Sequence, residues 1–76
     1  MTKEIFVKKS VELLQIMMEH KYCETVIEIS FNMMLPIPKE KKPIILEKFI
    51  EIARLGLPEQ DYHYEISQVF KEFMGY

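Results

Sequence analysis

The stretch from residue 42 to residue 58, KPIILEKFIEIARLGLP, decides the fold that this sequence predicts. Pro43 suits the first turn of a helix, where a missing N–H costs nothing and the backbone is already helical. Gly56-Leu57-Pro58 is a stop signal, because glycine accepts a left-handed conformation and proline cannot continue a helix. Between these signals, six apolar side chains share one broad face: Ile45, Leu46, Phe49, Ile50, Ile52 and Ala53. A face this wide contacts more than one neighbour, so we expect this segment to be the central helix.

A first helix is predicted from Lys3 to about Glu19. Thr2 is a suitable N-cap, and Glu4 lies where the helix dipole favours an acidic side chain. The residues expected on its inner face are Phe6, Val7, Val11, Leu13, Leu14, Met17 and Met18.

A last helix is predicted after Gly56. It begins either at Pro58 or after an N-cap at Asp61, since the acidic residues suit both possibilities. Its inner face would hold Tyr62, Ile66, Val69, Phe70 and Phe73, and it would end at Gly75, with Tyr76 folding back onto that face.

The segment from about Cys23 to Leu35 has two interpretations. As a helix it would bury Val26, Ile27, Ile29, Met33 and Met34. As a strand over about 26–34 it would alternate apolar and polar side chains. The chain shows no clear second strand, and one strand cannot satisfy its own backbone hydrogen bonds, so it would have to pair across a dimer. We favour the helix.

These elements predict an all-α fold over residues 1–76, as a single helical domain. The arrangement would be a small four-helix bundle or two stacked helical hairpins. Ser10 and Ser30 interrupt the apolar faces of the first two helices, which suggests that these small side chains face each other across a hairpin.

The chain is rich in apolar residues for its length. Of its 76 residues, 49% are hydrophobic, whereas a chain of this size hides only about 60% of the surface that its unfolded form exposes. Some apolar side chains should therefore remain exposed on a lone monomer. A protein partner or a second copy is the simplest way to cover them.

Charge and cysteine content exclude several classes. Ten basic and twelve acidic residues give a formal charge of −2, which provides no electrostatic footprint for nucleic acid or for a membrane surface. Cys23 is the single cysteine, so no intrachain disulfide framework exists, as is typical of a reducing compartment. No signal-peptide core or membrane-spanning run appears, and we expect a cytoplasmic protein.

The sequence contains no catalytic, metal or cofactor motif. His20, Cys23 and His63 are the only histidine and cysteine residues, one fewer than the four soft ligands of a structural zinc site. A buried Cys23 thiol beside a surface histidine explains the His20–Cys23 spacing. Nothing activates Cys23 as a nucleophile, so we expect no enzyme and no cofactor.

The segment IARLGLPEQDYHYEI allows a DNA-binding alternative, because it resembles a helix, a turn and a second helix. That second helix would carry Glu59, Asp61 and Glu65 toward phosphates that repel carboxylates. A small dimeric transcription regulator, built on this corner or on a dimeric strand, is the alternative hypothesis.

Several apolar residues miss the inner faces of their predicted helices and are therefore candidate partner-binding residues: Ile5, Ile16, Ile44, Leu55 and Tyr64. The sequence thus predicts a small, non-enzymatic protein–protein interaction or regulatory module that self-associates, with these side chains as anchors.

Overall fold

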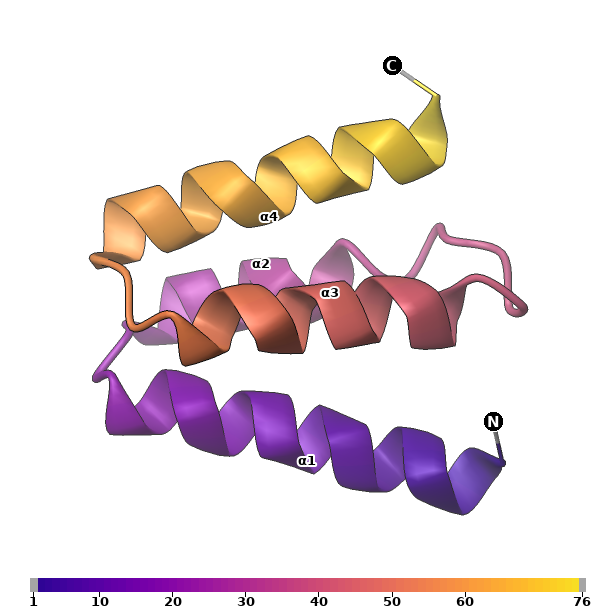
Figure 1. The fold of residues 1–76 in the computed structure, drawn as a ribbon, viewed down its shortest axis with the longest axis horizontal. Coiled ribbons are helices and arrows are strands. Elements are labelled where there is room, and N and C mark those ends of the chain that lie inside the picture. Colours follow the sequence, from indigo (N-terminus) through magenta and orange to yellow (C-terminus); the bar gives the residue numbers. More distant parts are fainter. Residues whose placement is uncertain (1, 76) are drawn as a thin grey trace.

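In the computed structural model, which describes residues 2–75, the chain folds into four helices and no strand. The helices are α1 (Lys3–Glu19), α2 (Glu24–Asn32), α3 (Lys42–Arg54) and α4 (Glu59–Met74). Successive helices reverse direction, so α1 runs parallel to α3 and α2 runs parallel to α4 (Figure 1). The all-α prediction and the bundle arrangement are confirmed. The expected position of Tyr76 lies outside the described residues.

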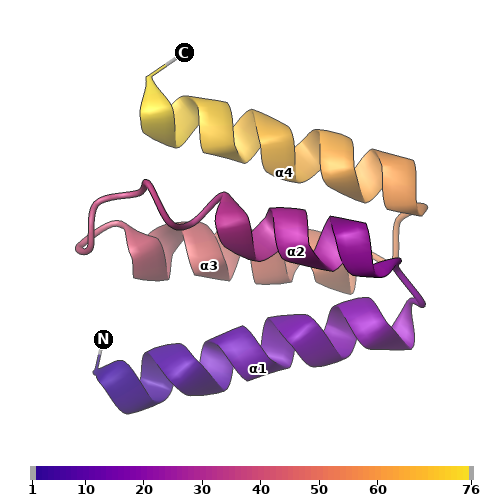
Figure 2. The ribbon, with the colours of Figure 1, turned by 180° about the vertical axis from the view of Figure 1, so that it is seen from behind.

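Helix α3 is central, as its sequence predicts. It packs against both α1 and α4, while α2 contacts α4 and lies in front of α3 when the molecule is seen from behind (Figure 2). Five of its side chains are buried, namely Ile45, Leu46, Phe49, Ile50 and Ala53, and Ile52 is half-buried against the core. The principal packing partner of α1 is thus α3, which is not its neighbour in sequence.

The strand alternative for residues 26–34 is wrong, because α2 is helical from Glu24 to Asn32 and continues into turns. Tertiary packing explains the choice. Val26 and Ser30, one helical turn apart, are buried together. A strand would also place these two side chains on one face, but it would need a second strand to satisfy its backbone hydrogen bonds. The helix satisfies those groups within itself.

Two helix ends differ from expectation: α2 ends at Asn32, before the predicted Leu35, and α4 begins at Glu59. Thr2 caps α1 through its side-chain oxygen, which accepts a hydrogen bond from the Ile5 N–H at 3.3 Å. Helix α4 begins at Glu59 with Pro58 as its N-cap, one residue after the first of the two expected starts. The alternative of an N-cap at Asp61 is wrong, because Asp61 lies inside the first turn. Gly56 has φ +67°, which confirms the left-handed residue expected after α3.

Ser30 joins α2 to α4 rather than to Ser10. Its hydroxyl donates to the Val26 carbonyl at 2.9 Å and lies 2.9 Å from the hydroxyl of Tyr62. Ser10 instead donates to the Phe6 carbonyl of its own helix at 3.0 Å. Ser30 and Tyr62 are fully buried, so this pair is a polar link inside the core.

Candidate interaction surface

Four of the five predicted partner-binding side chains are exposed. Ile5 lies in the first turn of α1, Ile44 in the first turn of α3, Leu55 at the end of α3 and Tyr64 in the second turn of α4. Ile16 differs, because it is half-buried and packs against the core. Its expected place on an open flank is therefore wrong.

The structure does not gather these residues into one patch. Ile44 and Leu55 lie at opposite ends of α3, about 16 Å apart along the axis at 1.5 Å per residue. Ile5 lies at the end where α1 and α3 begin, whereas Tyr64 follows the turn at the other end (Figure 1). Isolated exposed apolar residues are normal on a monomer, so this set does not define a contact surface.

A continuous apolar stripe lies on α1, formed by Val7, Val11, Leu14 and Met18. Val7 is 51% exposed, Val11 45% and Met18 61%, and Leu14 is half-buried. Their spacings of four, three and four residues place them within about 60° of one another around the helix. These side chains were expected inside the protein, and that expectation is wrong for Val7, Val11 and Met18.

The width of the apolar face on α1 explains the error. Apolar residues on this helix extend from Ile16 through Leu13 to Val11, more than half of its circumference at 100° per residue. Only part of such a face fits against one neighbour. Leu13 and Met17 are fully buried, which leaves one edge of the face open. The excess width was the available signal, but periodicity alone could not identify the edge.

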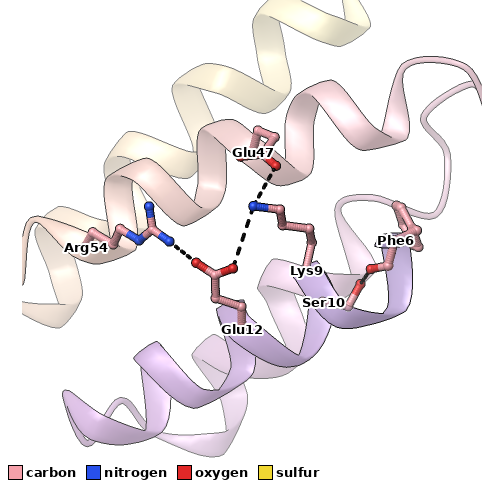
Figure 3. Close-up of polar contacts among 6 residues, drawn as sticks. All are labelled: Phe6, Lys9, Ser10, Glu12, Glu47 and Arg54. Carbon is pink, nitrogen blue, oxygen red and sulfur yellow. Dashed lines mark hydrogen bonds and ion pairs between the residues drawn. The ribbon is translucent and has the colours of Figure 1, made fainter. Parts of the chain in front are cut away.

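Ion pairs hold α3 against the other side of α1. Lys9 Nζ lies 3.3 Å from Glu47 Oε1 and 3.8 Å from Glu12 Oε1, and Arg54 pairs with Glu12 (Figure 3). Lys9 and Glu12 are about 100° to 160° around the helix from Val11. The charged seam therefore lies on the side of α1 away from the stripe, and exposed pairs of this kind contribute only about 0–1 kcal/mol each.

Hydrogen bonds from the α1–α2 turn hold the end of the molecule where α1 and α3 stop. His20 Nε2 lies 3.0 Å from the Ala53 carbonyl oxygen, and the Tyr22 hydroxyl donates to the Leu57 carbonyl. Tyr22 also packs on Tyr62, with ring centroids 4.9 Å apart. Burial, followed by the nearby Glu59 carboxylate, raises the pKa of Tyr22. These contacts join the α1–α2 turn to the α3–α4 turn.

Cys23 and Glu59 form the outer part of this junction. The Cys23 thiol donates to Glu59 Oε1 at 3.0 Å, and its N–H donates to Oε2 at 3.1 Å. These two hydrogen bonds lower the pKa of Glu59, the thiol contributing more than the N–H. Cys23 is exposed, so the expectation of a buried thiol is wrong. The pair links the beginnings of α2 and α4.

Charges separate along the long helices. A hollow of about 520 Å³ where α1 and α3 begin is lined by Thr2, Lys3, Phe6, Lys39, Lys42 and Pro43. The bases Lys8, Lys9 and Lys41 lie on the same elements, with Glu4 and Glu40 as acids. Toward the other end lie Glu19, Glu24, Glu28, Glu59, Asp61 and Glu65, with Lys21 and Arg54 as bases. One end is therefore basic and the other acidic.

Comparisons with protein-family models, curated proteins and solved structures gave no match. Within residues 2–75, no helix is long and apolar enough to cross a membrane. The same residues contain no group of three His, Cys, Asp or Glu side chains placed to hold a metal ion. The exposed surface of the chain is therefore the feature that bears on its function.

Proposed function

We propose that this protein is a non-enzymatic protein–protein interaction module that self-associates. The supporting observation is the stripe of Val7, Val11, Leu14 and Met18 on α1, three of whose side chains are exposed. Aligned apolar side chains on a helix gain free energy when a second protein surface removes them from water. Scattered exposed residues would not favour one partner surface in this way.

The reactive side chains support a binding role over a catalytic one. The Cys23 thiol is hydrogen-bonded to a carboxylate, and a ring nitrogen of His20 contacts a backbone carbonyl. Both groups thus take part in joining two turns. A nucleophilic cysteine is typically activated by a neighbouring histidine or positive charge, whereas the hydrogen-bond partner of the Cys23 thiol is a glutamate carboxylate at 3.0 Å.

The DNA-binding alternative is less favoured. One form of it needed a strand around residues 26–31, and those residues are helical. The other form would present the first turn of α4, where Glu59 and Asp61 lie, to a polyanion. A protein partner is compatible with both the acidic turn and the apolar stripe. The free, exposed Cys23 is typical of a reducing compartment such as the cytoplasm.

Mass in solution tests the proposal. Light scattering over a range of protein concentrations should show the average mass rising from 9.2 kDa toward at least twice that value, because association follows mass action. A constant mass of 9.2 kDa at the highest concentration would contradict self-association.

A further inference from the structure

We infer that α1 is the self-association surface and that it binds α1 of a second copy in antiparallel orientation, with a two-fold axis between Val11 and Leu14. This inference rests on the proposed self-association and specifies its surface and geometry. A two-fold contact uses the same patch on both copies, so that patch must complement itself.

The spacing of the stripe is the same in both directions. From Val7 to Met18 the intervals are four, three and four residues, so reversing one helix superimposes apolar positions on apolar positions. Val7 then lies opposite Met18 of the second copy, and Val11 lies opposite Leu14. Intervals of three and four are those at which side chains of two helices interdigitate. The pairing would cover the three exposed members of the stripe.

The charges beside the stripe select the antiparallel orientation. Glu4, Lys8 and Glu19 are exposed on one flank of α1, within about 100° of Val11. Reversing the second helix places Lys8 near Glu19 of the second copy. In a parallel arrangement the two-fold axis would run along the helices and bring opposite flanks together, so Lys8 would not meet Glu19 of the second copy.

The charges at the helix ends agree with this orientation. Glu4, in the first turn of α1, would lie opposite Lys21, which follows the last turn in the second copy. The basic end around Lys3 and Lys39 would also lie toward the acidic end around Glu24 and Glu59. Complementary fields of this kind favour a second copy as the partner.

The first test removes the apolar contact. Val11→Glu should keep helix content, because Val11 is 45% exposed and glutamate is a better helix former than valine. It should also reduce the protein to a 9.2 kDa monomer. The matched control is Ile44→Glu on α3, since Ile44 is 52% exposed and lies outside the stripe. Circular dichroism establishes folding for both variants.

The second test exchanges charges. Lys8→Glu and Glu19→Lys each place like charges together twice in a symmetric dimer, so each variant alone should associate about tenfold more weakly. An equimolar mixture should recover wild-type affinity, because the mixed dimer restores opposite charges at both contacts. Lys48→Glu on α3 is the control, which should neither weaken association nor rescue Glu19→Lys. Sedimentation equilibrium measures all of these mixtures.

The outcomes separate this inference from the proposed function. If the wild-type protein associates and Val11→Glu also associates, self-association stands and the α1 surface is wrong. If Val11→Glu is monomeric but mixing gives no recovery, the antiparallel orientation is wrong. A wild-type protein that stays at 9.2 kDa overturns both proposals. Loss of association with Val11→Glu but not with Ile44→Glu, together with recovery on mixing, supports the inference.

Discussion

The hydroxyl groups of Ser30 and Tyr62 lie 2.9 Å apart in the core and join α2 to α4. The Tyr62 hydroxyl also lies 3.3 Å from Met17 Sδ of α1, and Ser30 contacts the Val26 carbonyl. Three helices thus meet at one small polar cluster. Buried polar groups that form hydrogen bonds with one another favour one packing arrangement over alternatives, so this cluster fixes the position of the short helix α2 against α4.

Ser30→Ala should lower the free energy of unfolding by about 1–2 kcal/mol, since it removes a buried hydroxyl partner of Tyr62. Ser10→Ala is the matched control, because Ser10 also donates to the carbonyl four residues earlier but is only part-buried. The control should change stability by less than about 0.5 kcal/mol. Urea denaturation of the two variants measures the difference, and equal losses would contradict a special role for Ser30.

Stability should fall at alkaline pH because of Tyr62. Burial raises the pKa of Tyr62 to about 12 from its ordinary value of 10.0, against the opposing effect of the Ser30 hydrogen bond. The folded state therefore keeps the phenol proton that the unfolded state releases. Its contribution is complete below pH 10 and is lost as the pH rises to about 12, amounting to about 3 kcal/mol.

Tyr62→Phe separates this effect from lysine titration in the same range. The variant has no phenol, so its stability should decline less steeply than that of the wild-type protein above pH 10. Urea midpoints at neutral pH and at increasing alkaline pH provide the comparison. Parallel curves for the two proteins would show that Tyr62 does not keep its proton in the folded state.

Gly56→Ala should destabilise the protein by about 1 kcal/mol. Gly56 has φ +67° in the α3–α4 turn, and an L side chain is strained in that region. The added Cβ would not clash, since it would meet the His20 ring at ordinary contact distances, Cε1 at 3.5 Å and Nε2 at 4.0 Å. Gly56→Asn should therefore cost less than Gly56→Ala, because asparagine tolerates this conformation better. Thermal unfolding gives the ranking, and the reverse order would contradict backbone strain as the cause.

Ile16 and Leu55 should respond differently to the same substitution. Ile16→Glu places a carboxylate against the core and should cost about 2 kcal/mol or more. Leu55 is 68% exposed, so Leu55→Glu should change the free energy of unfolding by less than about 0.5 kcal/mol. Chemical denaturation followed by circular dichroism measures both. A similar loss for the two variants would mean that Leu55 has a core partner.

The central helix could be predicted from the sequence because its signals are local. Pro43 and Gly56 act on the backbone around them, and the apolar periodicity between them needs no knowledge of a neighbour. The boundaries of α3, from Lys42 to Arg54, follow from those residues. The helical identity of α2 was less secure, since its alternation of apolar and polar residues suits a strand equally well.

The candidate surface could not be predicted from the sequence, because its signals are not local. Whether Val11 or Ile16 faces the core depends on where α3 lies, and that position depends on how Leu13 and Met17 of α1 pack with the buried side chains of α3. These contacts join residues far apart in sequence. Local sequence patterns contain no such information, which explains why they predict Ile16 outside and Val11 inside, whereas Ile16 packs against the core and Val11 is exposed.

The packing of α1 on α3 also affects the order in which the helices can fold during synthesis. Glu12 and Arg54 are 42 residues apart, so α1 leaves the ribosome well before the helix that shelters its inner side. The α3–α4 hairpin, by contrast, closes over a short turn and can form early. Until α3 has been synthesised, the first helix exposes both its inner-face side chains and the stripe. We therefore expect chaperones to recognise this segment.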